Sequence, residues 1–86
     1  MELRYSSAFK KQYKKLPKRT REQFKKRLTL FLKDDREVRL HIHKLAGVYD
    51  GLWSMNVTGE IRAVFDQGVP DVVLFVAIGS HSELYS

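Results

Sequence analysis

The chain has 86 residues, a length that corresponds to one compact domain over residues 1–86 and leaves no room for a large enclosed cavity. The hydrophobic share of 43% is ordinary for a folded globular protein, and the absence of cysteine excludes disulfides, thiolate zinc sites and a thiol nucleophile. The N-terminus has no apolar signal segment and no apolar run is long enough to cross a membrane, so we expect a cytoplasmic protein with no membrane partner.

Positive charge is concentrated in the first half of the chain. Residues 1–45 carry 15 Lys and Arg against 5 Asp and Glu, a net +10, whereas residues 46–86 carry 1 basic and 5 acidic side chains, a net −4. This asymmetry favours a polyanionic partner such as RNA for the N-terminal half. The alternative is a lysine-rich helix surface that only keeps the protein soluble.

The N-terminal half predicts a strand followed by two helices. Leu3 and Tyr5 alternate with polar neighbours as in a short strand, and Ser6 and Ser7 then offer helix N-caps. Two helical patterns follow, separated by Pro17, and the second ends near residues 34–35. Their inward-facing positions, three or four residues apart, are Phe9, Tyr13 and Leu16 in the first and Phe24, Leu28, Phe31 and Leu32 in the second.

The C-terminal half predicts a sheet. Residues 51–57 and 61–65 alternate between apolar and polar side chains and form a hairpin, while residues 72–78 are apolar on both faces, as in a central strand that Gly79 ends. Residues 38–45 are a loop or a strand. The order β-α-α-β-β-β indicates an α+β fold: one mainly antiparallel sheet, a helical hairpin packed on one face, and the polar meander residues on an open second face.

Metal and cofactor chemistry is not expected from the sequence. His41 and His43 with the distant His81 form only a weak zinc pattern, because no carboxylate is placed as a second shell. No nucleophilic serine motif and no glycine-rich phosphate loop is present. We therefore expect no bound metal and no cofactor.

Cleavage of RNA without a metal needs only a few protein groups, since the 2′-OH of RNA is itself the nucleophile. A general base, a general acid, a cation for the phosphate and an aromatic ring for a base suffice. The chain supplies these types in His43, Glu60, Arg62, His81 and Tyr85. Each also has a structural explanation: an ion pair for the arginine, a backbone hydrogen bond for His43, a solvated tail for His81, and core packing for the tyrosine.

Three segments, residues 43–47, 51–65 and 78–85, resemble the RelE/ParE toxin superfamily. The H-x-L-x-G pattern that starts at His43 and the G-S-H-S-E-L-Y ending are similar to YafQ-type toxins, and the G-x-W-S hairpin that runs through Arg62 is similar to YoeB. The resemblance implies a RelE-like fold. It also implies the toxin half of a toxin–antitoxin pair.

Members with these motifs are ribosome-dependent mRNA endonucleases that use no metal and leave a 2′,3′-cyclic phosphate and a 5′-OH. By position, the resemblance makes His81 the general acid or base, His43 a second proton-transfer or phosphate-contacting residue, and Arg62 the phosphate ligand. Glu60 matches a carboxylate at or near the site, and Tyr85 an aromatic residue that orients the substrate. The expected partners are an antitoxin, mRNA and the ribosome, the last contacted by Lys10, Lys11, Lys14, Lys15, Lys18 and Lys44.

Two positions depart from the YafQ pattern. Ala77 stands where those toxins carry an arginine, and Asn56 where they carry a histidine. Both changes predict a weakened or substrate-shifted toxin, in which Arg62, one strand away, does the work of the missing arginine as in the YoeB-like pattern. Two alternatives therefore stay open: a ParE-like gyrase poison, which has no chemical need for His81, Arg62 and Tyr85, and a decayed toxin that serves as an antitoxin-binding subunit.

Overall fold

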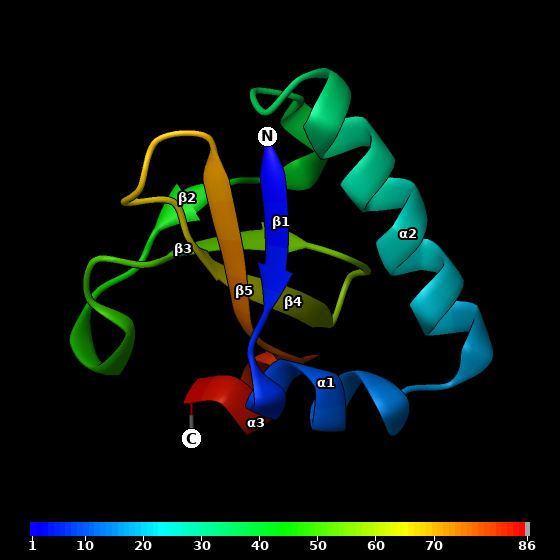
Figure 1. Ribbon diagram of the computed structural model, residues 1–86. Helices are drawn as coiled ribbons and strands as arrows, with labels where there is room; N and C mark the ends of the chain where they lie inside the picture. The colour runs from blue at the N-terminus through cyan, green and yellow to red at the C-terminus, as the bar shows by residue number, and fades with distance from the viewer. Residues whose placement is uncertain (86) are drawn as a thin grey trace.

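A five-stranded sheet in the order β1-β5-β4-β3-β2 forms the centre of the protein (Figure 1). The computed structural model describes residues 1–85. The elements are β1 (Glu2–Tyr5), α1 (Ser7–Lys14), α2 (Lys18–Lys33), the 3-10 turn η1 (Val38–Leu40), β2 (His43–Lys44), the 3-10 turn η2 (Gly47–Tyr49), β3 (Trp53–Asn56), β4 (Ile61–Asp66), β5 (Val72–Ser80) and α3 (His81–Tyr85). Strand β1 runs parallel to β5 and the other pairs are antiparallel, which confirms the predicted α+β sheet.

The ends of α1 and α2 follow from single residues. The Ser6 hydroxyl accepts a hydrogen bond from the Phe9 N–H at 3.0 Å, which caps α1, and donates to the Val76 carbonyl at 2.9 Å, which ties the helix to β5. Pro17, which cannot continue α1, stands at the N-cap of α2. Helix α2 ends at Lys33 with Asp34 as its C-cap, as predicted.

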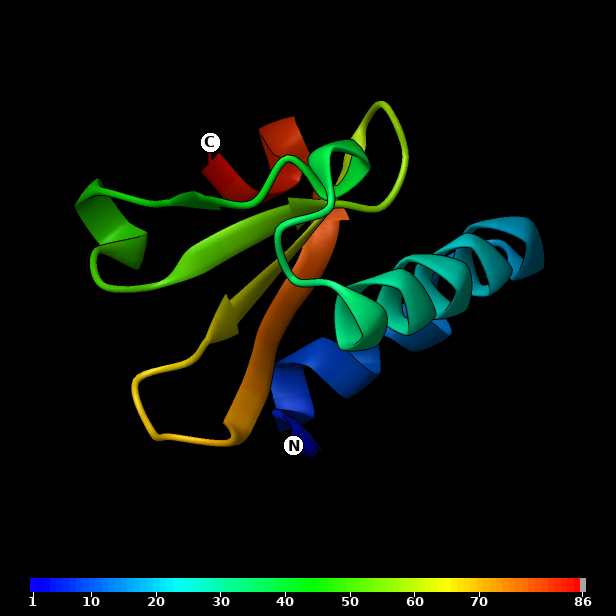
Figure 2. The same cartoon turned by 90° about the horizontal axis from the view of Figure 1, so that it is seen from above.

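An aromatic core joins the two helices to one face of the sheet. Phe75 lies at its centre, with ring centroids 5.4–5.7 Å from those of Phe9, Phe24 and Phe65. Figure 2 shows α1 and α2 on this side of the sheet and α3 on the other. Leu32 was predicted to face this core but is exposed, because it is turned about 100° from the buried Phe31 and lies at the side of the helix.

A bulge in β5 lets that strand serve two cores. The register with β4 shifts between Val64 and Phe65, so that Val64 faces Ala77 while Phe65 faces Phe75, and Val76 is the extra residue. Phe75 and Ile78 therefore both pack in the aromatic core although they are three residues apart. The strand continues through Gly79 to Ser80, so the prediction that Gly79 ends it is wrong.

The second face of the sheet is partly covered, not open throughout. Helix α3 and residues 45–52 build a small second core around Val64, Ala77 and Leu84. The sequence predicted an irregular tail after Gly79, but residues His81–Tyr85 form the helix α3. A reciprocal capping box starts this helix: the Ser80 N–H donates to the Glu83 carboxylate at 2.8 Å, and the Glu83 N–H donates to the Ser80 hydroxyl at 3.1 Å. Among residues 1–85, no helix is long and apolar enough to cross a membrane.

Candidate functional site

A groove of about 500 Å³, here called the histidine groove because His41, His43 and His81 line it, lies on the second face of the sheet, beside α3. It gathers four of the five predicted catalytic residues, His43, Arg62, His81 and Tyr85, from β2, β4 and α3. The remaining lining residues are His41, Leu45, Ala46, Ser54 and Asn56. The structure thus brings together predicted catalytic residues that are up to 42 positions apart in the chain.

The register of three strands places the polar side chains of the groove. Arg62 pairs with Asn56 on β3 and with Gly79 on β5, while His43 on β2 pairs with Ser54. Because side chains alternate between faces, Ser54 and Asn56 point to the same side of β3, opposite the aromatic core. The sequence analysis did not include Ser54 among the site residues, although the alternation around Asn56 carried that information.

The Arg62 guanidinium is held by the turn between β3 and β4. Its Nη1 donates to the Thr58 and Gly59 carbonyls at 3.0 Å each, with a longer contact to the Ile61 carbonyl at 3.4 Å. The ion pairs found within residues 1–85 are Arg4 with Glu2 and Arg39 with Glu37, so the ion pair considered for Arg62 is not formed there. The carbonyls hold the guanidinium without neutralising its charge, and the Arg62 side chain lines the groove.

His81 and Tyr85 are fixed by the short helix α3. The His81 N–H donates to the Glu60 carbonyl at 3.1 Å, and the capping box holds the turn that contains it. The Ser80 N–H, followed by the Ser80 hydroxyl, lowers the pKa of Glu83 from its ordinary value. The His81 and Tyr85 rings lie 4.6 Å apart, and Tyr85 in turn meets Tyr49 edge-on at 5.6 Å.

His43 is anchored by a main-chain contact two residues earlier. Its Nδ1 lies 2.8 Å from the His41 carbonyl, which is the backbone bond that the sequence analysis considered for this residue. His41 itself adopts the left-handed conformation, with φ at +47°. Although three histidines line the groove, no group of three His, Cys, Asp or Glu side chains within residues 1–85 is placed to hold a metal ion.

Glu60 is the predicted catalytic residue that the structure leaves outside the groove. It lies in the exposed turn between β3 and β4 and does not line the groove. Its link to the site is through the main chain, because its carbonyl accepts the His81 N–H.

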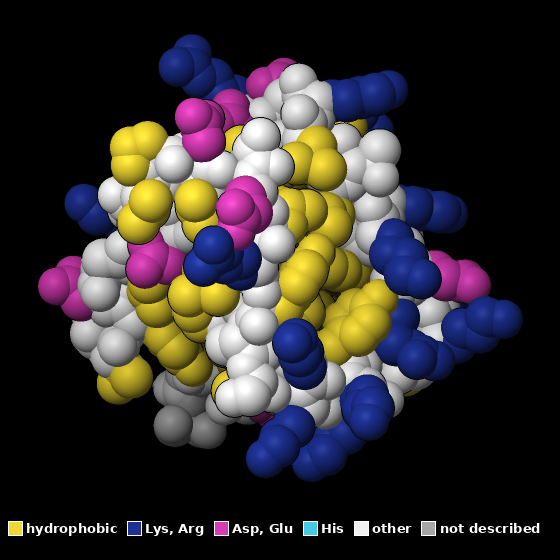
Figure 3. Space-filling model, viewed as in Figure 1, with side chains coloured by type: hydrophobic (Ala, Val, Ile, Leu, Met, Phe, Trp, Pro, Cys, Tyr) yellow, Lys and Arg dark blue, Asp and Glu magenta, His cyan; other side chains and the backbone are white. Residues whose placement is uncertain are grey.

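Most of the predicted RNA-binding lysines lie on the other face of the sheet. Lys10, Lys11 and Lys14 of α1, with Lys25 of α2, surround an apolar groove of about 570 Å³ between the two helices. Its apolar lining is Tyr5, Phe9, Tyr13, Phe24 and Leu28, and burial there raises the pKa of Tyr5. Figure 3 shows this hydrophobic patch with Lys and Arg side chains around it.

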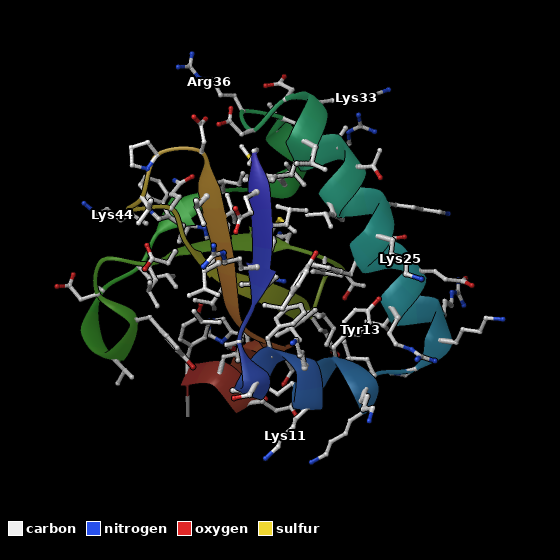
Figure 4. All side chains as sticks on the ribbon, viewed as in Figure 1. Lys11, Tyr13, Lys25, Lys33, Arg36 and Lys44 are labelled. Carbon is white, nitrogen blue, oxygen red and sulfur yellow. The ribbon has the colours of Figure 1, made fainter. Side chains whose placement is uncertain are left out.

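Lys44 is the predicted RNA-binding residue that neighbours the histidine groove, since it follows His43 on β2. Figure 4 places it far from Lys11 on α1 and from Lys25 on α2. Lys15 and Lys18 are exposed at the connection between α1 and α2. The predicted basic surface therefore has two separate parts, one at α1 and the start of α2 and one on β2.

A sequence model of the family described as a bacterial toxin of type II toxin–antitoxin system, YafQ, matches residues 1–86. The fold is similar to that of YafQ from E. coli strain BL21(DE3), with a TM-score of 0.83 at 19% identity over 99% of this chain and 98% of that one. It is also similar to a YoeB/ParE toxin from Agrobacterium tumefaciens (TM-score 0.76, 19% identity, 94% of this chain and 99% of that one). A chain of the RelB-RelE antitoxin-toxin complex from Methanococcus jannaschii matches with a TM-score of 0.74 at 18% identity, over 95% of this chain and 94% of that one.

No curated protein sequence matches the chain. The match to the family model covers every residue, and the structural neighbours share the whole fold, including the sheet that carries the histidine groove. The chain belongs to the YafQ family, the bacterial toxins of type II toxin–antitoxin systems.

Proposed function

We propose that this toxin is a ribosome-dependent mRNA endonuclease whose active site is the histidine groove. The observation that carries the proposal is the convergence of His43, Arg62, His81 and Tyr85, from β2, β4 and α3, on one shallow groove. These are two imidazoles, a guanidinium and an aromatic ring, a set that suffices for the transesterification of RNA.

The reaction is an attack of a ribose 2′-oxygen on the adjacent phosphorus. One imidazole accepts the 2′-hydroxyl proton as the new O–P bond forms, and the other gives a proton to the 5′-oxygen as its bond to phosphorus breaks. The products are a 2′,3′-cyclic phosphate and a 5′-OH. Imidazole suits both steps because its ordinary pKa of about 6.5 lies close to neutrality.

Arg62 and Tyr85 support the two histidines in different ways. The Arg62 guanidinium, oriented by the Thr58 and Gly59 carbonyls, stabilises the negative charge that grows on the phosphate oxygens. Tyr85, exposed at the end of α3 and backed edge-on by Tyr49, offers a ring on which a base can stack.

Contact with the ribosome is supported by the lysines on the face opposite the groove. A protein that cuts mRNA on the ribosome has to touch mRNA with one surface and ribosomal RNA with another. In this protein Arg62 lines the groove, and the lysines of α1 and α2 lie on the opposite side of the sheet. Such contacts release counterions and weaken steeply with salt. Action on translating ribosomes places the toxin in the cytoplasm.

An antitoxin is the proposed protein partner. Two similar solved structures are described as DinJ-YafQ and RelB-RelE complexes, in which a toxin is bound to its antitoxin. The apolar groove between α1 and α2, ringed by four lysines, fits an acidic amphipathic segment of such a partner. Charge reversal at Lys10 and Lys14 is expected to weaken, in a pull-down, the toxin's complex with the antitoxin that relieves its growth arrest. An undiminished complex would remove this groove from the interface.

The test of the nuclease function is induced expression in a bacterial host of the wild type beside His81→Ala, with primer extension on a reporter mRNA. We expect growth arrest with in-frame cuts that disappear in the variant, while circular dichroism shows the same fold. Arrest with intact mRNA in both strains would favour a gyrase poison. No arrest in either would favour a decayed toxin.

A further inference from the structure

We propose that the left-handed turn at His41 fixes the neutral His43 ring as the Nδ1–H tautomer and thereby makes its Nε2 the general base. The inference rests on the proposed nuclease function and adds the role of each imidazole. His41 acts here as a positioning residue, through its main chain.

The contact between the two residues decides the tautomer. The His43 Nδ1 lies 2.8 Å from the His41 carbonyl oxygen, and a carbonyl can only accept, so Nδ1 carries the proton. In the neutral ring the lone pair is then on Nε2, on a side chain that lines the groove. A hydrogen bond of ordinary strength shifts the tautomer ratio by about fivefold.

The turn that presents this carbonyl is unusual for a residue with a side chain. His41 has φ at +47°, a conformation in which a Cβ is disfavoured and which glycine and asparagine adopt more readily. It is held from both sides: Leu40 is fully buried, Ile42 packs against the same core, and the His41 N–H donates to the Val38 carbonyl at 3.1 Å. Backbone strain that the surrounding structure maintains is typical of functional sites.

With this tautomer the proton path has a direction. Nε2 of His43 takes the proton from the 2′-hydroxyl, the 2′-oxygen bonds to phosphorus, and the bond from phosphorus to the 5′-oxygen breaks. The 5′-oxygen takes its proton from His81, which enters the reaction as an imidazolium and leaves it neutral. His43 ends protonated, so the charges balance and both rings reset through solvent.

The first test reads the tautomer without any substrate. Long-range proton–nitrogen correlation spectra of the free, labelled protein, recorded at a pH where His43 is neutral, distinguish a protonated from an unprotonated ring nitrogen. We expect Nδ1 of His43 to be the protonated nitrogen. A ring protonated mainly at Nε2 overturns the inference and leaves the proposed nuclease function standing.

The second test separates the turn from the His41 imidazole. His41→Gly and His41→Asn keep a residue suited to positive φ, whereas His41→Val does not, and all three remove the imidazole. We expect the first two to keep the Nδ1–H tautomer and the third to lose it, with kcat about fivefold or more below that of His41→Gly and KM unchanged.

Equal tautomers and equal kcat in His41→Gly and His41→Val would overturn the inference. So would an equal loss in all three variants, because it would assign the effect to the imidazole of His41. Matched circular dichroism and unfolding midpoints keep a folding defect from imitating the result. Absence of cleavage in the wild type itself would refute the proposed function instead, and the spectra would still report the tautomer.

Discussion

Arg62 gives the sharpest test of the proposed chemistry, because its structural and catalytic contributions differ in size. Its Nη1 makes two 3.0 Å bonds to the Thr58 and Gly59 carbonyls at a half-buried position, so Arg62→Ala is expected to lower the free energy of unfolding by about 1 kcal/mol. Loss of a donor that faces the transition-state phosphate typically costs a factor of about 10²–10³ in kcat, or about 2.7–4 kcal/mol. The effect on catalysis should therefore exceed the effect on stability.

The assay is single-turnover cleavage of a short mRNA on programmed ribosomes, with ribosome binding measured separately by co-sedimentation. We expect Arg62→Ala to reduce the cleavage rate by about 10²-fold or more, with a much smaller change in binding, because the phosphate charge grows in the transition state. Arg62→Lys is the matched control, since it keeps the charge and loses the planar fork, and its rate should lie between the two. Wild-type cleavage by a folded Arg62→Ala protein would refute the role, and equal losses of rate and binding would reduce it to substrate affinity.

Three further predictions follow from the same structure. Replacing the lysines of α1 and of its C-cap by glutamine should weaken ribosome association and reduce the slope of log K against log salt by up to about three; the residues are Lys10, Lys11, Lys14 and Lys15. An unchanged slope would mean that this face is only solvated. The pKa of Glu83 is lowered in the folded protein, so its carboxylate stabilises the fold at pH values above the unfolded-state pKa of about 4.3. This contribution disappears as the pH falls through the lowered folded-state pKa. The melting curves of Glu83→Gln and wild type should therefore differ near neutrality and converge in acid. Phe75→Ala should cost about 3–5 kcal/mol in urea denaturation, because the ring is fully buried at the centre of the aromatic core; a cost below 1 kcal/mol would contradict that core.

The elements that bury one regular face could be predicted from the sequence. The three-to-four spacing that includes Phe9 and Phe24 predicted both helices, and the alternation around Trp53 and Ile61 predicted the β3–β4 hairpin. The apolar run of β5 predicted its central place, which is confirmed by its pairing with β1 and β4. Periodicity succeeds here because a single buried face imposes it.

The elements that depend on distant partners could not be predicted. Strand β2 has two residues and exists because His43 pairs with Ser54. The bulge at Val76 could not be recognised in the sequence, because β5 is apolar on both faces and packs in two cores, so an extra residue does not interrupt an alternating pattern. Helix α3 could have been predicted from its start, because the spacing of Ser80 and Glu83 is that of a capping box. It was missed because its five residues are too few to show a helical period.

For the groove, the sequence predicted which residue types take part but not how each of them is positioned. Chemistry alone suggested His43, Arg62, His81 and Tyr85, and the structure places all four along one groove. The same chemical argument did not indicate that Glu60 is linked to the site only through its main-chain carbonyl. The turn at His41 was also not foreseen, because a positive φ at a histidine is set by the packing of the residues beside it and not by its own type.

Ala77, which stands where YafQ toxins carry an arginine, does not by itself leave the groove without a cation. Ala77 is buried in the second core against Val64 and Leu84, whereas Arg62, two residues before Val64 on β4, lines the groove about 7 Å further along the strand. A small side chain at 77 lets Leu84 bury itself and seats α3, the helix that carries His81. Arg62 on β4 therefore supplies a cation to the groove that does not depend on the residue at position 77.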